Sequence, residues 1–282
     1  MSEATTSELS PADTKTSWRR WVTTYPIIAF LVPTYVFQTV LALMHHYEIR
    51  NYGAGVLRPF APAFFAFVVA WIADGKPTAM KYLKSFTLYR QPWYYYAFAL
   101  LYPSAVGAVS LVILRIIGLN THIELDWESV ETFEFFFLQV RVAASEELAW
   151  VSFMVAVLAT RYRLFQASMF VGFAWGVWYI PLVLTVIQVA PGFPIGPLII
   201  NFMCIASICA WLYARTKSAL LVFIMQFTTA YTGQIVPVLP LRGGDLQYEA
   251  FVVCKCVFAV ALYVFWGPKP LFGAAKAAHD DR

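Results

Sequence analysis

Long apolar stretches are the feature that most limits what this chain can fold into. An α-helix needs about 20 residues to cross a bilayer, and most of the stretches reach that length. A backbone in lipid must satisfy its hydrogen bonds internally, which a helix does within one segment. We therefore predict an all-α fold, a polytopic integral membrane bundle of about eight transmembrane helices. The expected spans are residues 26–47, 57–73, 93–119, 133–160, 164–190, 194–213, 218–240 and 249–266.

The composition excludes two other classes of protein. Only 13% of the residues are charged and 60% are hydrophobic, whereas a soluble domain carries about 25% charged residues. A soluble enzyme and a disordered regulator are therefore ruled out. The net charge of +4 is modest, so we expect the lipid bilayer, and no nucleic acid, as a partner. The four cysteines do not suggest a disulfide framework, and we expect them to be packing residues.

Lys and Arg are distributed unevenly between alternate loops. The cytoplasmic loops of membrane proteins carry the excess of these residues. If the N-terminus lies in the cytoplasm, fourteen Lys and Arg side chains fall on the cytoplasmic side, and Arg50, Arg58 and Arg242 fall on the opposite side. The acidic segment 120–132 also falls opposite. We therefore predict a multi-pass membrane protein with both termini in the cytoplasm.

The two ends of the sequence are polar. Residues 1–25 begin without the hydrophobic core and cleavage site of a signal peptide, so we predict a disordered cytoplasmic N-terminal tail. Residues 267–282 are expected to form a second, short cytoplasmic tail. No internal repeat divides the sequence between them. Residues 26–266 are therefore expected to form one intramembrane domain.

Ionisable residues inside the expected spans are expensive to bury, which makes each one a functional candidate. Arg115 lies near the end of its span and can reach the interface, and Lys255 can do the same. Arg141 shares a helix face with Glu134, so we expect an ion pair between them. These three basic residues therefore have structural explanations.

Glu146 and Glu147 are adjacent near the middle of the expected span 133–160. Two ionised carboxylates at this depth would each cost several kcal/mol. Burial and mutual repulsion favour one protonated acid beside one carboxylate, which is the arrangement of a general acid/base pair. The structural alternative is that one glutamate caps a helix break while the other is protonated.

An aromatic stripe follows in the next span. Phe173, Trp175, Trp178 and Tyr179 lie close together in the sequence. Trp175 and Trp178 share a helix face, and Tyr179 joins Trp175 one turn later. Such stripes more often serve packing or anchoring at the membrane surface. Beside a buried glutamate pair, the stripe indicates a substrate pocket, to which Trp150 would also contribute.

These residues resemble the signature of the CPBP family, the type II CAAX prenyl endopeptidases, also called Abi proteins. The family motif G-E-E-x-x-W-R-G-F corresponds to residues 145–153, which keep both glutamates, the tryptophan and the phenylalanine. The motif W-x-x-W-H-x-P-L corresponds to residues 175–182, and H-x-x-x-N falls on Gln226 and Ala230. The resemblance covers about residues 60–235 and implies an eight-helix intramembrane protease.

The sequence departs from the family at four signature positions. Val151 stands where the family has arginine, Tyr179 and Gln226 where it has histidines, and Ala230 where it has asparagine. The resemblance implies that the glutamates and histidines activate the attacking water, with or without a metal. The histidines of this chain lie outside the motifs, so we expect no catalytic metal or other cofactor. Tyr179 and Gln226 can still donate hydrogen bonds.

Three functions follow from these residues. The first is cleavage of a prenylated or hydrophobic peptide in the membrane, with Tyr179 or Gln226 stabilising the oxyanion. The second is an isoprenoid cyclase or isomerase started by a protonated Glu147, with tryptophans that stabilise cations. The third is a non-catalytic relative that binds a membrane partner or a lipid. The predicted catalytic residues are Glu146, Glu147, Tyr179 and Gln226, and the predicted substrate-binding residues are Trp150, Phe173, Trp175 and Trp178.

Overall fold

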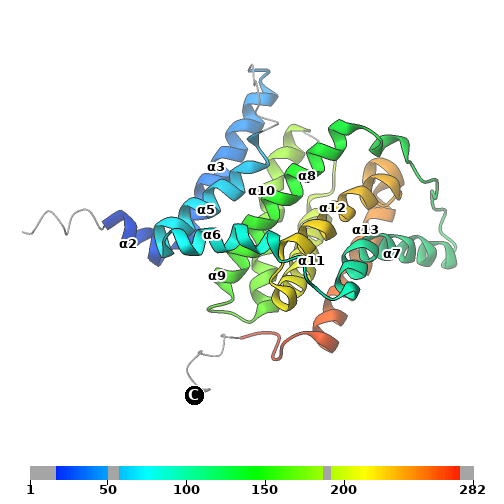
Figure 1. Ribbon diagram of the computed structural model, residues 1–282. Coiled ribbons are helices and arrows are strands. Elements are labelled where there is room, and N and C mark those ends of the chain that lie inside the picture. The colour runs from blue at the N-terminus through cyan, green and yellow to red at the C-terminus, as the bar shows by residue number, and fades with distance from the viewer. Residues whose placement is uncertain (1–16, 50–56, 187–191, 274–282) are drawn as a thin grey trace, which may run out of the picture.

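The computed structural model describes residues 17–49, 57–186 and 192–273. Within these ranges the chain is helical and forms no β-strand, which confirms the all-α prediction. The short helices are α2 (Ser17–Thr24), α6 (Lys76–Lys84), η1 (Ser85–Thr87), η2 (Glu128–Val130), η3 (Leu148–Val155) and α9 (Ala156–Leu158). The longer helices are α3 (Pro26–His46), α5 (Phe60–Asp74), α7 (Trp93–Ile116), α8 (Phe133–Glu147), α10 (Leu164–Thr185), α11 (Ile195–Thr216), α12 (Ala219–Ile235) and α13 (Pro240–Trp266) (Figure 1).

Each expected span is helical in the structure, but the helices differ in whether they are long and apolar enough to cross a membrane. Among the described residues, α3, α7, α10, α11 and α13 are long and apolar enough. Helices α5 and α12 are apolar but shorter, and α8 continues through η3 into α9. Eight crossings therefore stay a prediction. The expected end of the fifth span, residues 187–190, lies outside the described residues.

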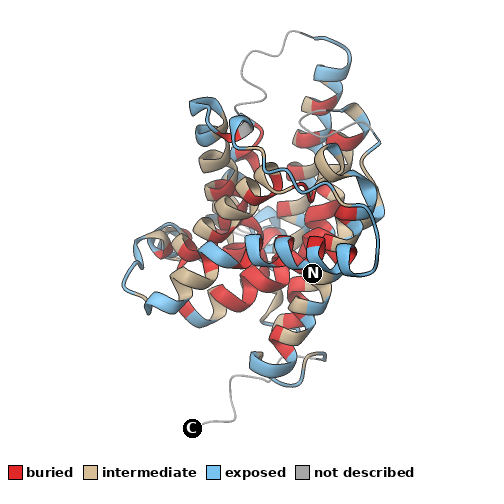
Figure 2. Cartoon of the chain, turned by 90° about the vertical axis from the view of Figure 1, so that its right-hand side faces the viewer, coloured by how far each residue is buried: buried red, intermediate tan, exposed pale blue. Residues whose placement is uncertain are grey.

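The helices pack in an order that differs from their order along the chain (Figure 1). Helices α3 and α5 pack together at one side, whereas α7 and α13 lie at the other. Between them, α10 pairs with α11, and α12 packs on α7 and α8. Buried residues gather toward the centre of the bundle (Figure 2). Apolar side chains such as Val36, Leu101 and Val257 are exposed, as expected for surfaces that face lipid.

Glycine lets α10 and α11 approach each other closely. A Cβ added at Gly172 would lie 2.3 Å from Met203 Cα, and one at Gly176 would lie 2.8 Å from Ile199 Cα. The two glycines are four residues apart, which is the small-residue spacing that brings membrane helices into backbone contact. This contact fixes α10, which carries the aromatic motif, against α11.

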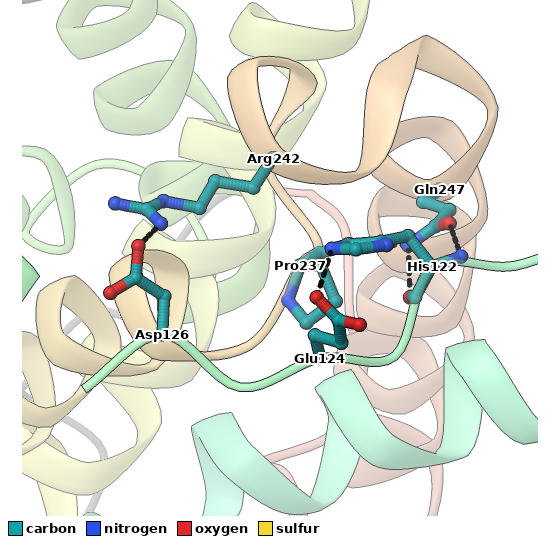
Figure 3. A network of polar contacts seen from close by, with 6 residues as sticks. All are labelled: His122, Glu124, Asp126, Pro237, Arg242 and Gln247. Atoms are coloured by element: carbon teal, nitrogen blue, oxygen red, sulfur yellow. Dashed lines mark hydrogen bonds and ion pairs between the residues drawn. The ribbon is translucent and has the colours of Figure 1, made fainter. Parts of the chain in front are cut away.

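The segment between α7 and α8 is fastened to the start of α13 (Figure 3). The backbone N–H of His122 donates to Gln247 Oε1 at 2.7 Å. Gln247 Nε2 donates in turn to the carbonyl oxygens of His122, at 3.1 Å, and of Pro237, at 2.5 Å. Arg242 forms an ion pair with Asp126 in the same network. These contacts tie the approach to α8 to the junction between α12 and α13.

Helix α2 corrects the prediction of a disordered tail over residues 1–25. Residues 17–24 are helical, and Val22 is buried where α2 packs on α3 and α5. Two tryptophans and two arginines precede this valine in α2, so the segment is amphipathic and gains apolar burial by folding. Residues 1–16 and 274–282 lie outside the described residues.

Two basic residues within the helices are not placed as predicted. Lys255 does not reach the interface but is 1% exposed. Its Nζ donates to Asn201 Oδ1 at 2.8 Å and lies 4.1 Å from the ring centroid of Phe251, so an amide and an aromatic face replace water. Within the described part of the chain, Arg141 and Glu134 form no ion pair. Seven residues separate them by about 10.5 Å along the helix axis.

Candidate active site

The two glutamates lie where α8 meets the π-helix η3. Helix α8 ends at Glu147, and the eight residues that follow, Leu148 to Val155, are π-helical and all buried. Glu146 is 2% exposed and Glu147 is 0% exposed. π-helical turns are rare and occur frequently at functional sites. Glu147 is thus the last α-helical residue before the wider π-helical turn.

The carboxylate of Glu146 accepts hydrogen bonds from two aromatic side chains of α10. Trp175 Nε1 donates to Glu146 Oε2 at 2.9 Å. The Tyr179 hydroxyl lies 3.1 Å from both oxygens of Glu146. Trp175 and Tyr179 are four residues apart, so one turn of α10 presents both donors to the same group. The structure thus brings together three of the residues that the sequence singled out.

A cavity of about 140 Å³ lies beside Glu146, between α8, α10, α11 and α12. Its polar lining is mainly Glu146, Tyr179, Gln226 and Gln139. Gln139 and Glu146 are seven residues apart, which places them on one face of α8. The cavity therefore gathers a carboxylate, a phenol and two amides around a space large enough for water.

Glu147 does not line this cavity. Its side chain lies near Gln226 of α12 and Cys209 of α11. Among the described residues, neither oxygen of Glu147 has a hydrogen bond of good geometry. The adjacent glutamates are therefore not equivalent, because Glu146 is hydrogen-bonded and faces open space whereas Glu147 is enclosed.

The remaining predicted substrate-binding residues lie behind or outside the cavity. Trp150 stacks on Trp175, with ring centroids 5.8 Å apart and ring planes 13° apart. Trp178 Nε1 donates to the carbonyl oxygen of Thr34 at 3.3 Å. These two tryptophans support the site without lining its cavity. Phe173 is 52% exposed. It precedes Trp175 by two residues, which is a rotation of about 200° around the helix. Its assignment to the pocket is corrected.

Arg58 joins the site, although the sequence analysis counted it only among the basic residues on the side opposite the cytoplasm. The side chain is 5% exposed, and Cζ lies 5.8 Å from the ring centroid of Trp178. The guanidinium hydrogen-bonds Tyr179 and interacts electrostatically with Glu146. One signal was available in the sequence: the expected span that begins at residue 57 is short, and prolines follow Arg58 closely.

The donor set does not fit a metal-dependent site. The Trp175 N–H donates to Oε2 of Glu146, and the Tyr179 hydroxyl lies near both oxygens. An indole N–H is a donor that cannot ligate a cation. In the ranges that the structure describes, no group of three His, Cys, Asp or Glu residues is arranged to hold a metal ion. The chemistry of this site is therefore that of a carboxylate surrounded by hydrogen-bond donors.

A comparison with protein families agrees with this geometry. Residues 128–232 match the family model described as type II CAAX prenyl endopeptidase, Rce1-like. The resemblance to the CPBP family is confirmed. The matched segment includes Glu146, Tyr179 and Gln226, and its apolar helices suit a membrane. The chain is thus a membrane protein with a segment similar to the CAAX proteases, residues 128–232. No curated protein matches it at a significant level.

Proposed function

We propose that this CAAX protease-like protein hydrolyses a peptide bond within the membrane, close to a prenyl or other hydrophobic group of its substrate. The observation that carries the proposal is the environment of Glu146, a buried carboxylate that reaches a cavity and accepts hydrogen bonds from Trp175 and Tyr179. The family match supports a prenylated peptide as the substrate class. The partners that the proposal requires are the lipid bilayer and that peptide.

Glu146 acts as the general base in this proposal. Its carboxylate takes a proton from a water molecule in the cavity, and the resulting hydroxide attacks the carbonyl carbon of the scissile amide. The Tyr179 hydroxyl and the Gln226 amide, which both line the cavity, donate to the oxyanion. When the C–N bond breaks, the proton on Glu146 passes to the leaving amine. Glu147, enclosed beside Gln226, orients that amide.

The size of the cavity favours hydrolysis over isoprenoid cyclisation. Pockets that enclose a whole organic ligand measure about 300–1,000 Å³, whereas this cavity measures about 140 Å³. A cyclase must enclose the folded isoprenoid chain, because water would quench its carbocations. A peptide group and a few water molecules, each with a share of about 30 Å³ in the liquid, need far less room. In the proposed reaction, the prenyl chain stays among the apolar surfaces outside the cavity.

The contacts of Glu146 favour an enzyme over a non-catalytic relative. Replacing a buried ionic group with apolar residues is often neutral or stabilising, so a buried carboxylate is a poor choice for stability alone. Here Trp175 and Tyr179 both donate to this carboxylate, and Arg58 adds a nearby positive charge. A titratable group with such partners at a cavity is typical of active sites.

The test compares three glutamine variants on one helix. The full-length protein in proteoliposomes receives a peptide with a farnesylated cysteine near its C-terminus, and mass spectrometry measures the released fragment. We expect Glu146→Gln to lower the rate by at least about 100-fold, as the loss of a general base does. Glu147→Gln should cause a smaller loss. The control is Glu134→Gln, at an exposed position near the start of α8, which should match the parent.

The possible results separate the three functions. Parental hydrolysis by Glu146→Gln would contradict the role of this residue. A parent protein that releases no fragment but converts farnesyl diphosphate would support the isoprenoid reaction instead. A parent that changes neither compound, yet retains the farnesylated peptide in a binding assay, would support the non-catalytic function. Thermal unfolding of each variant shows whether a loss of activity is a loss of folding.

A further inference from the structure

Arg58 is a charged side chain buried beside the candidate active site. It is 5% exposed, and arginine keeps its charge in proteins. Burying such a charge is costly unless an anion and hydrogen-bonding partners lie close to it. The residue belongs to the segment before α5, outside the segment 128–232 that matches the family. Neither the family match nor the proposed reaction assigns it a role.

Two contacts fix the position of Arg58. The Ser145 hydroxyl donates to the carbonyl oxygen of Pro59. This contact places the residue after Arg58 against the residue before Glu146. The guanidinium also lies over the Trp178 ring, with Cζ 5.8 Å from the ring centroid, a distance at which a cation is attracted to the aromatic face. The backbone and the side chain of this segment are therefore both anchored at the site.

The polar contacts run from Arg58 through Tyr179 to Glu146. Arg58 hydrogen-bonds the Tyr179 side chain, and the Tyr179 hydroxyl lies 3.1 Å from both carboxylate oxygens of Glu146. The positive charge of Arg58 also acts directly on Glu146. Glu147 also lies near Glu146, and a negative charge on it would oppose the effect of Arg58. Arg58 thus supplies a positive charge to a site that holds two acidic side chains.

We propose that Arg58 is a positioning residue of this site. Its guanidinium holds the Tyr179 hydroxyl and the Glu146 carboxylate in one arrangement and balances the charge of that carboxylate. The inference rests on the proposed function, because the arrangement matters when Glu146 accepts a proton. At that step the Tyr179 hydroxyl turns from the carboxylate to the oxyanion, and its bond to Arg58 keeps the phenol in place during the exchange.

The first measurement separates kcat from KM in the full-length protein with the farnesylated peptide. Arg58→Met removes the charge and the donors but keeps much of the length. We expect it to lower kcat by about 100-fold, the cost of a misplaced catalytic group, with KM changed less than about threefold. Arg58→Lys should recover much of the loss because it keeps the charge. The matched control is Arg115→Met, which removes an exposed cation in the last turn of α7 and should leave kcat unchanged.

The second measurement does not need activity. In a double-mutant cycle, the thermal unfolding temperatures of Arg58→Met, Glu146→Gln and the double variant are compared with that of the parent. If the two side chains interact, the shifts of the single variants do not add, and the double variant unfolds at a higher temperature than their sum predicts. If Arg58→Met does not fold, Arg58→Gln takes its place in the cycle, because it also removes the charge. Tyr179→Phe, which removes only the bridging hydroxyl, should then reproduce the loss of kcat.

Each result decides the proposal. Additive unfolding shifts would overturn it, and so would a parental kcat in Arg58→Met. Hydrolysis that is lost in Glu146→Gln but kept in Arg58→Met would overturn this inference while leaving the proposed function in place. Non-additive shifts in a protein that hydrolyses no peptide would support the Arg58–Glu146 interaction and overturn the proposed function.

Discussion

Trp175 donates its indole N–H to the Glu146 carboxylate at 2.9 Å, across the contact between α10 and the end of α8. Trp150 stacks on the same indole, with ring planes 13° apart. Stacking restrains the rotation of Trp175, so its donor stays aimed at the carboxylate. Together with the Tyr179 hydroxyl, which contacts the same carboxylate, this hydrogen bond joins the first two sequence motifs.

Replacing Trp175 with phenylalanine tests that bond. Trp175→Phe keeps an aromatic ring but removes the donor, and a hydrogen bond to a charged group contributes about 1.5–3 kcal/mol. We expect kcat for the farnesylated peptide to fall by roughly 10- to 100-fold. Trp178→Phe is the matched control, because it removes a donor to a backbone carbonyl of α3 and leaves Glu146 untouched. Equal losses in the two variants would show that the indole N–H of Trp175 has no special role.

The contact between α10 and α11 should not tolerate a methyl group. Gly172→Ala places Cβ against the Met203 backbone, so the helices must separate, and we expect a destabilisation of about 1–3 kcal/mol, as for other overpacked cores. The control is Gly196→Ala in α11, where a Cβ would meet no atom within 4 Å. That variant should be as stable as the parent or slightly more stable. Thermal unfolding in detergent measures both, and an unchanged Gly172→Ala would refute the close contact.

The buried amine of Lys255 should depend on Asn201. Asn201→Leu removes the oxygen that accepts from Lys255 Nζ, and we expect it to lower the free energy of unfolding by about 1.5–3 kcal/mol. Adding Lys255→Met removes the charge that has lost its partner and should restore much of this stability. Chemical denaturation of the two variants provides the comparison. A double variant that is less stable than Asn201→Leu would contradict this dependence.

The orientation in the membrane is open to chemical labelling. In a background without the four native cysteines, Glu128→Cys and Lys81→Cys each place one thiol at an exposed position. The excess of Lys and Arg on one side predicts that residue 128 faces away from the cytoplasm and residue 81 faces it. An impermeant thiol reagent should therefore label the first variant in intact cells and the second only after permeabilisation. The reverse pattern would invert the topology.

The helices were predictable from sequence because each apolar stretch must satisfy its backbone within itself. The packing order was not, since apolar residues cover nearly every face of these helices and leave little amphipathic pattern to read. Lys255 illustrates the difficulty. Its position in the sequence suggested that the amine reaches the membrane interface, whereas the amine is buried and donates to Asn201 of another helix. Polar contacts between helices depend on the tertiary arrangement and cannot be read from a single sequence.

The core of the candidate site was predictable because its residues belong to two recognisable motifs, and Trp175 and Tyr179 lie one helical turn apart. Glu146, Trp175 and Tyr179 lie together as the sequence suggested. Phe173 is close to Trp175 in sequence, but the 100° step of a helix turns it away from the cavity. Arg58 could not be placed, because the contact that brings it to Glu146 passes through Pro59 and Ser145, which are far apart in the chain.

The distance along the chain between Arg58 and the glutamate motif has an evolutionary consequence. The motif arginine of the family is replaced here by Val151, while a guanidinium from a different segment lies near Glu146 of the motif. If one positive charge suffices, the two positions should covary among relatives. Sequences with valine in the motif should keep a basic residue at the place of Arg58, and sequences with arginine in the motif should be free to lose it. A protein whose motif lacks the arginine can then still have a complete site, because a codon far from the motif encodes the residue that supplies the positive charge.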